Sequence, residues 1–339
     1  MLPSYWRLRE KIRMSSFFQK IIGRAIFIVQ ILWCSHTGEF RKRVQETAKT
    51  SANVGGVALC VRMRDEALNM KEFVEYYLAA GISHIFIYEA LSKDDFHVVL
   101  DPFVLSGHVT LIDNWPHVPI SPNAEHDCIL RCIGKYGWLG CIDVDEFVVI
   151  KNIQRIDDFL KAMPSRYPAI ALHWKLFGSN GHITRPDGPV IAEYTRREED
   201  TNLHVKVFLR PERAARYRNS HSWYYSGIFS TAINEHRKRV YGSISTPPTG
   251  EFAWINHYHH KSESEYLAKA NRISILDPIG MRFNNRTLER GKKYEQRANA
   301  VCDQSALEYH RALCTRKDCS ICSFIARTVR ITSKTYSKS

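Results

Sequence analysis

The chain has 339 residues, which is enough to bury a full hydrophobic core as one large domain or two smaller ones. Its hydrophobic content of 44% and charged content of 24% are those of an ordinary soluble globular protein, and the absence of repeats and low-complexity segments excludes a repeat or largely disordered chain. The net charge of +13 lies mostly at the ends: residues 1–52 hold ten Lys and Arg against three Glu (+7), and residues 323–339 hold four against none (+4). The basic ends therefore suit an anionic surface, whether nucleic acid, membrane or phosphorylated glycolipid.

The N-terminal segment mixes apolar and aromatic side chains with Arg and Lys. Residues 5–34 have the pattern of an amphipathic helix, which could lie at a membrane interface or pack on the folded domain. The apolar run 25–34 has ten residues, too few to span a bilayer. Residues 36–53 are polar and basic and predict a linker. We therefore expect a basic N-terminal extension over 1–53, a folded domain over 54–300 and a Cys-containing, basic, helical tail over 301–339.

The nine cysteines fall into two groups. Most lie singly inside apolar runs, where they resemble small buried hydrophobic residues, and this usage indicates a reducing compartment. Cys314, Cys319 and Cys322 lie close together in the tail, with Cys302 upstream. Four thiols could bind zinc, but the spacing matches no standard zinc knuckle, so free thiols remain the alternative.

The first half of the domain alternates strands and helices. Short buried apolar runs predict strands at 57–61, 85–88, 109–112 and 138–142, and helical periodicity predicts helices at 70–78, 98–105 and 123–136. This alternation is typical of an α/β protein with a mostly parallel, Rossmann-like sheet and helices on both faces. We expect further strands at 147–150, 169–174, 204–209 and 253–260, loops at 177–182 and 184–202, and a helix at 262–272 capped by Ser262 and Glu265.

Three acidic residues follow the strand at 138–142. In open α/β sheets ligands bind at the carboxyl ends of the strands, which is where Asp143, Asp145 and Glu146 fall. Asp143 and Asp145 lie two apart, so in an extended chain both face one ion, and their hard oxygen atoms suit Mg²⁺ or Mn²⁺. The alternative is a solvated acidic turn between two strands, because Asp-x-Asp is a common tripeptide.

Other candidates lie at the ends of neighbouring strands. His257 and His259 share one face of an extended segment, so one of them could complete a metal site, and Lys261 could meet phosphate. Arg62 and Arg64 follow the first strand, where an anionic ligand is expected. Without a ligand, these residues would form a surface strand and a solvated loop.

Four segments together resemble glycosyltransferase family 92 and related bacterial family-2-like enzymes of the GT-A fold. They are residues 57–81 (VALCVRMRDEALNMKEFVEYYLAAG), 84–95 (HIFIYEALSKDD), 138–148 (WLGCIDVDEFV) and 255–266 (INHYHHKSESEY). The resemblance covers roughly residues 55–275. It departs after the second strand, where this chain has Glu-Ala-Leu-Ser instead of the frequent Asp-Asn-x-Ser.

The resemblance implies a hexosyltransferase that uses a nucleotide-diphosphate sugar and a divalent cation, Mn²⁺ or Mg²⁺. Asp145 would be the main metal ligand, Asp143 would bind the metal or the ribose, and His257 would be the third ligand. The other residues implied in donor binding are Arg62, Arg64, Glu66, Asp95 and Lys261.

Enzymes near this family invert the anomeric centre, which requires a general base. The acidic run 198–200 lies where that base is expected, and we favour Glu199 and Asp200, with Glu193 as a rival. The acceptor would be a glycan or glycolipid, such as an envelope polysaccharide or lipopolysaccharide core.

The expected location is cytoplasmic, with the basic ends on the anionic inner membrane surface. The nearly neutral middle of the chain has no nucleic-acid recognition motif, so we expect no nucleic-acid partner. The alternatives are a nucleic-acid-binding protein with basic tails and a zinc-bound Cys cluster, and a non-catalytic protein of the same fold.

Overall fold

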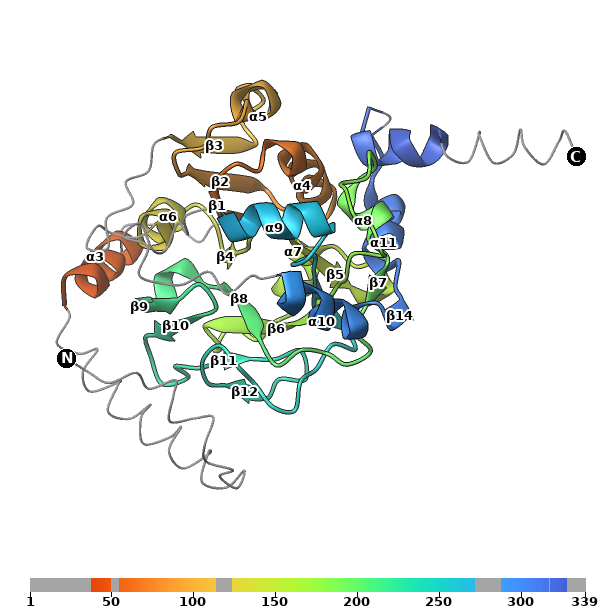
Figure 1. The fold of residues 1–339 in the computed structure, drawn as a ribbon. Helices are drawn as coiled ribbons and strands as arrows, with labels where there is room; N and C mark the ends of the chain where they lie inside the picture. Colours follow the sequence, from red (N-terminus) through yellow and green to blue (C-terminus); the bar gives the residue numbers. More distant parts are fainter. Residues whose placement is uncertain (1–37, 50–54, 114–123, 272–287, 317, 328–339) are drawn as a thin grey trace, which may run out of the picture.

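The computed structural model describes residues 38–49, 55–113, 124–271, 288–316 and 318–327 (Figure 1). The predicted amphipathic helix at 5–34 lies outside these residues, as do the last residues of the basic C-terminal end. Within the described part of the chain, no helix combines the length and the apolar character needed to cross a membrane.

The first half of the chain forms the parallel part of a ten-stranded sheet, as the alternation predicts (Figure 1). Four strands run parallel to their neighbours in the order β3-β2-β1-β4. Their bounds are β1 (Val57–Met63), β2 (His84–Glu89), β3 (Val109–Ile112) and β4 (Trp138–Cys141). The helices between them are α4 (Ala67–Ala79), α5 (Phe96–Leu105) and α6 (Ala124–Cys132).

The second half extends the sheet with mixed strand directions. β8 (Val205–Leu209) pairs antiparallel with both β4 and β6 (Ala169–Leu176). β13 (Ala253–His257) pairs parallel with β6 and antiparallel with β5 (Glu146–Ile150), while β11 (Ala232–Ile233) and β12 (Arg239–Val240) complete the far edge. The α/β class with a mostly parallel sheet is confirmed.

The two faces of the sheet bury separate cores, because side chains alternate along each strand. On β1, Val57, Leu59, Val61 and Met63 pack into the core beneath α4 and α5. Ala58 and Cys60 point to the other face and pack against α6. The sheet therefore has helices on both faces, as predicted, and Cys60 is a buried thiol, as expected for cysteines in apolar runs.

Two tyrosines join α4 to the strand that follows the acidic tripeptide. The hydroxyl of Tyr77 donates to the backbone oxygen of Glu146 at 2.8 Å, and that of Tyr76 donates to the oxygen of Val148 at 2.8 Å. Both rings also lie against Phe147. These contacts hold the start of β5, and with it the acidic turn, against the helix that begins just after Glu66.

The predicted linker is wrong over residues 38–49, because α3 (Gly38–Lys49) forms there and packs on the domain. Val44 is fully buried, and Phe40 and Ala48 are partly buried beside it at helical spacing. The ring of Phe40 lies 4.2 Å from that of His126 on α6. The apolar stripe is only one residue wide per turn among many charged residues, so composition alone suggested a linker.

Several short elements were not predicted. They are η1 (Lys151–Ile153), α7 (Ile156–Lys161), α8 (Val190–Glu193), β7 (Arg196–Arg197), η2 (Pro211–Arg213) and the hairpin of β9 (Ala214–Asn219) and β10 (Ser222–Tyr225). The predicted loop at 184–202 thus contains α8 and β7. Elements of two to six residues carry too little periodicity to be recognised in a sequence.

The C-terminal residues pack on the domain. After α9 (Glu263–Asn271) come α10 (Leu288–Ala298), β14 (Val301–Cys302) and α11 (Ser305–Leu313). β14 pairs antiparallel with β7, and α11 contacts α4, α8 and β5. The division of the chain at residue 300 stays a prediction, and the residues that follow it up to 313 share contacts with the sheet.

Gly140 on β4 provides a test of the packing between β1, β4 and β8. A Cβ atom there would lie 2.5 Å from Cε1 of Phe208 and 2.9 Å from Cδ2 of Leu59. We expect Gly140→Ala to lower the free energy of unfolding by about 1–3 kcal/mol, the usual cost of overpacking a core. Urea denaturation measures this, with Gly55→Ala as the control, since no atom lies within 4 Å of that position. Equal stabilities for the two variants would contradict the packing described.

Candidate functional site

The register of β13 brings the C-terminal histidine to the acidic turn. β13 pairs antiparallel with β5 so that His257 lies opposite Glu146. The pairing continues into the turn, where the amide of Tyr258 donates to the backbone oxygen of Asp145 at 2.8 Å. As a result, Nε2 of His257 lies 3.6 Å from Oδ1 of Asp145. Two predicted metal ligands that are 112 positions apart in the sequence are therefore neighbours.

Asp145 is held as a carboxylate by nearby positive charge. Its Oδ2 lies 2.6 Å from Nζ of Lys269 on α9. Burial alone would raise the pKa of Asp145, but Lys269 and His257 outweigh it and hold the pKa well below its usual range. Lys269 was not predicted, because it lies on an ordinary polar helix with no motif to mark it.

Asp143 is paired with a buried lysine. Nζ of Lys206 lies 2.7 Å from Oδ2 of Asp143 and 3.4 Å from Oε2 of Glu146, and the lysine side chain is 1% exposed. Burial would lower the pKa of Lys206, but these two carboxylates raise it above its usual value. Burial also opposes ionisation of the partly exposed Asp143, yet Lys206 and Arg62 lower the pKa of that carboxyl overall.

Lys206 is a site residue that the sequence reasoning missed. It is the one charged residue in the five-residue strand β8, whose other members are Val, Val, Phe and Leu. A buried ammonium group needs an anionic partner, so a lysine inside an apolar strand was a detectable signal.

The two arginines after β1 lie at this edge of the sheet. Nε of Arg62 is 3.4 Å from Oε1 of Glu125 on α6, and Arg62 is close enough to Asp143 to lower its pKa. Arg64 lies 3.8 Å from the carboxylate of Asp65. The arginines lie where the sequence predicted an anionic ligand. Arg62 also pairs with Glu125, an acidic residue that the sequence did not indicate as part of the site.

Lys261 and Glu66 meet beside Asp145. Nζ of Lys261 lies 3.9 Å from Oε2 of Glu66, and the lysine is 2% exposed. Burial lowers the pKa of Lys261, although Glu66 and Asp145 act to raise it. The predicted capping box follows directly: Oγ of Ser262 accepts from the amide of Glu265 at 3.3 Å, and Oε2 of Glu265 accepts from the amide of Ser262 at 3.3 Å. The cap fixes the start of α9, which carries Lys269.

The predicted acid after β2 is placed differently. Asp95 is exposed at the start of α5. Its neighbour Asp94 turns toward β1 instead, and its Oδ2 accepts from the amide of Ala67 at 2.7 Å. The structure therefore brings Asp94, and not Asp95, against the loop that holds Glu66.

The predicted general bases lie on the segment next to β6. Glu199 and Asp200 are exposed, whereas the side chain of Glu198 is 14% exposed and lies 3.3 Å from Nη2 of Arg297. The amide of Glu198 donates to the oxygen of Leu176, whose strand partner is His257. Burial raises the pKa of Glu198. The rival Glu193 lies elsewhere, with its carboxylate 4.0 Å from Nε2 of His182.

An aromatic surface borders the metal-ligand candidates. The ring of Trp174 on β6 lies 4.3 Å from that of His257, 5.3 Å from that of His204 and 5.0 Å from that of His221. Burial and Lys206 lower the pKa of His221 to about 4, so this imidazole is neutral at physiological pH. The half-buried indole of Trp174 beside these imidazoles offers a flat apolar wall with polar edges, which suits a sugar ring.

The protein side chains of the site supply only part of the ligand set of a divalent cation. Asp145 and His257 supply a carboxylate and an imidazole, and the ammonium of Lys269 shows that Asp145 attracts a positive charge. Asp143 is directed to Lys206. Among the described residues, only the group His310, Cys314, Cys319 and Cys322 brings three or more metal-ligand atoms within 4.8 Å of one another. The described residues of the acidic site therefore offer an incomplete ligand set, and a divalent cation there would need further oxygen ligands, such as substrate phosphates.

The sequence matches a protein family and several of its members. The model of glycosyltransferase family 92 matches residues 56–304. A family 92 protein of Ricinus communis is 29% identical over 164 residues, which cover 46% of this chain and 29% of that protein. One of Arabidopsis thaliana is 21% identical over 239 residues, covering 68% of this chain and 39% of that protein. The chain thus spans well under half the length of these relatives.

Similarity to solved structures is weaker. A structure of residues 1–349 of Staphylococcus aureus TarS with UDP has a TM-score of 0.30 and 14% identity, covering 46% of this chain and 47% of that one. Glucosyl-3-phosphoglycerate synthase from Mycobacterium tuberculosis, solved with Mn²⁺, UDP-glucose and phosphoglyceric acid, has a TM-score of 0.28 and 13% identity, covering 50% and 60%. These values are too low to support an inference about the site.

Replacing Lys206 tests the charge balance of the acidic turn. Lys206→Met leaves Glu146, which is fully buried, without its cation, and we expect the free energy of unfolding to fall by about 3–5 kcal/mol at neutral pH. Burial raises the pKa of Glu146 well above its usual range. The folded variant therefore binds more protons than its unfolded chain, so its free energy of unfolding rises as pH falls. The loss of stability caused by Lys206→Met should accordingly be smaller at low pH.

Urea denaturation at pH 5 and pH 8 measures both effects. Lys161→Met is the matched control, because Lys161 is 64% exposed and its pairs with Asp157 and Asp158 should contribute within about 0.5 kcal/mol. A Lys206→Met variant as stable as this control would refute the claim that Lys206 compensates the buried charge of the acidic turn.

Proposed function

The chain belongs to glycosyltransferase family 92, and from this premise we propose that it transfers a sugar from a nucleotide-diphosphate sugar to a glycan or glycolipid, with inversion of the anomeric centre and with the help of a divalent cation. The observation that carries the proposal is the contact of Asp145 with His257, made by the pairing of β13 with β5. It joins the acidic turn to the C-terminal motif at the carboxyl edge of the sheet, where ligands of open α/β sheets bind.

Positive side chains converge on the place proposed for the donor diphosphate. Lys261 and Lys269 lie near Asp145, and Arg62 and Lys206 lie near Asp143. All four are extensively buried, so their interactions are less screened than those of surface charges. We assign Lys261 to the diphosphate, and Arg62, Arg64 and Glu66 to the nucleotide. Asp95 remains a weaker candidate for the nucleotide because it is exposed.

Asp145 and His257 are the proposed protein ligands of the cation, Mn²⁺ or Mg²⁺, with Asp143 at the ribose or the metal. A bound divalent ion would neutralise charge that develops on the departing diphosphate. Lys269 contacts Oδ2 of Asp145, whereas His257 lies against Oδ1, so the lysine and a bound cation would share that carboxylate. The lysine therefore keeps Asp145 ionised before the donor arrives.

The general base is proposed to come from the acidic segment 198–200. Glu199 and Asp200, predicted from sequence, are exposed and would act only if the acceptor covers them. Glu198 has stronger support, since it is partly buried, its backbone is bonded to β6 next to His257, and burial raises its pKa. A carboxylate with a raised pKa is a better proton acceptor for a sugar hydroxyl.

The acceptor is proposed to enter beside the glycine-rich loop at 177–182. A cavity of about 300 Å³ lies between this loop, His260 and α10, and its polar lining includes Ser179, His182 and Glu295. Hydroxyl, imidazole and carboxylate groups can hydrogen-bond the hydroxyls of a glycan. The basic ends of the chain would contact an anionic membrane on its cytoplasmic side, as proposed from their charge.

Substitution of Asp145 tests the function and the cation together. We expect Asp145→Ala to lower transfer at least about 10²-fold, as with the loss of one preorganised electrostatic group. It should also abolish the Mn²⁺-dependent rise in thermal midpoint that the correct nucleotide sugar produces in the unaltered protein. Asp158→Ala on α7 is the control, since Asp158 is exposed and pairs with Lys161. Full activity in a folded Asp145→Ala variant would overturn the proposal.

The three acids of the segment can be ranked by amide substitution. We expect Glu198→Gln to lower kcat by roughly 10²-fold or more, within the range of general base catalysis, and to remove the fall in activity at acid pH. Glu199→Gln and Asp200→Asn are the matched controls at neighbouring positions, and each should lower kcat less than Glu198→Gln does. If one of them causes the larger loss, the exposed residue is the base and Glu198 only supports the fold.

A further inference from the structure

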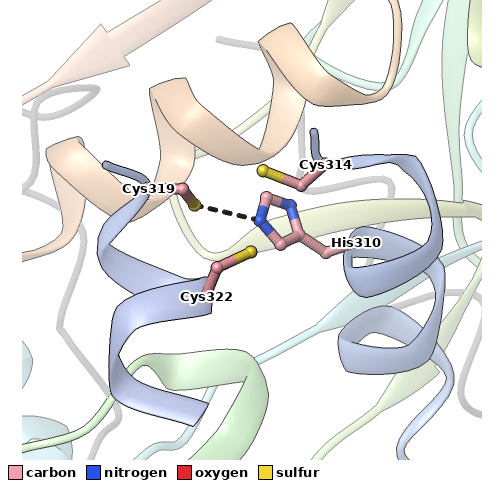
Figure 2. Close-up of side chains that lie close together, drawn as sticks. All are labelled: His310, Cys314, Cys319 and Cys322. Carbon is pink, nitrogen blue, oxygen red and sulfur yellow. Dashed lines mark hydrogen bonds between the residues drawn. The ribbon is translucent and has the colours of Figure 1, made fainter. Parts of the chain in front are cut away.

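Four side chains in the C-terminal segment form a compact group of sulfur and nitrogen atoms. His310 lies on α11, Cys314 follows the end of that helix, and Cys319 and Cys322 lie at and within the last described helix, residues 320–327. Their ligand atoms all lie within 4.8 Å of one another. Figure 2 shows the three sulfur atoms turned toward the imidazole of His310, with Nε2 of the ring 3.2 Å from Sγ of Cys319.

The composition of this group differs from the one considered from sequence. Cys302 is exposed on β14 and lies outside the cluster. His310 takes its place, because the helical turn between His310 and Cys314 puts positions four apart on the same side of the chain. The resulting order is His-x₃-Cys-x₄-Cys-x₂-Cys.

We propose that His310, Cys314, Cys319 and Cys322 bind a structural Zn²⁺ ion. One imidazole and three thiolates form a Cys₃His set, which is a common tetrahedral ligand set for zinc. All four positions are filled by protein, so the site has no open position for a substrate or a reactive water. The same soft ligands disfavour Mg²⁺ and Mn²⁺, which prefer oxygen.

The surroundings are built to hold the ligands in place. His310 and Cys319 are almost fully buried, and the ring of His310 stacks on that of Tyr76 at 5.6 Å with an angle of 16° between them. The carboxylate of Glu75 on α4 accepts from the amide of Ser320 at 2.9 Å, which positions the residue directly after Cys319. Side chains that bond to or pack against metal ligands orient them for binding.

At this position a bound ion would fix the C-terminal segment to the rest of the domain. It joins α11 and the last helix to the middle of α4, near Glu75 and Tyr76, which is ~14 Å along that helix from Glu66. The neighbouring Tyr309 donates to the backbone oxygen of Gln154, after β5, at 2.8 Å. The segment that the ion would fix therefore contacts both α4 and β5, the helix that begins just after Glu66 and the strand that begins at Glu146.

Metal content of the full chain, purified without chelator, tests the proposal. Elemental analysis should find one zinc per chain, and Cys319→Ser and Cys322→Ser should each reduce it by at least about tenfold. Cys302→Ser is the matched control and should retain the zinc. Asp145→Ala should retain it as well, which separates this site from the proposed catalytic cation.

A second measurement covers the case in which the cysteine variants fail to fold. A zinc chelator should lower the thermal midpoint of the unaltered protein by more than about 5 °C, and added Zn²⁺, but not Mg²⁺, should restore it. His310→Cys should keep the zinc, because four thiolates also form a tetrahedral site.

Three results would overturn the proposal. They are purified protein without metal that takes up none from a zinc solution, a chelated protein with an unchanged midpoint, and iron in place of zinc. A disulfide between two of the three cysteines in the protein as purified, found by mass spectrometry before reduction, would explain the first of these results, because those thiols could not then bind zinc.

Discussion

Compensation of buried charge at the carboxyl edge of the sheet is the constraint on which the site depends. Asp143, Asp145 and Glu146 lie within four positions, and like charges so close cannot all ionise in a buried turn without nearby cations. Lys206 reaches the turn from β8, and Lys269 reaches it from α9. Lysines from two different elements therefore compensate the charge of the acidic turn before any ligand binds.

This constraint explains why the late strands matter as much as the early ones. β1 and β4 present Arg62 and Asp143, but β8 supplies the cation and β13 supplies His257. β8 lies between β4 and β6, so the reversal of strand direction in the sheet places its lysine beside the acidic turn. The proposed donor site therefore draws its groups from both halves of the domain.

The C-terminal segment contacts the site indirectly, through α4 and β5. α4 begins just after Glu66, its tyrosines hold β5, and its middle carries Glu75 and Tyr76 at the His310 cluster. A zinc ion in that cluster would limit the movement of α4, which is bonded to β5 through Tyr76 and Tyr77, and of β5, which begins at the acidic turn. The proposed zinc site and the proposed catalytic site are thus chemically distinct but mechanically linked through one helix.

The sequence by itself determined the alternation of strands and helices through residue 150, the acidic turn, the histidine motif and the capping box, because each rests on local periodicity or on a short motif. It also marked Arg62, Glu66 and Lys261 as candidates that the structure brings to one edge. Only the tertiary structure decided the pairing of β13 with β5, the partnership of Lys206 with Asp143, the contact of Lys269 with Asp145, and the exchange of Cys302 for His310. These depend on contacts between residues far apart in the chain, and no local pattern specifies which distant strand or helix will supply the partner of a buried charge.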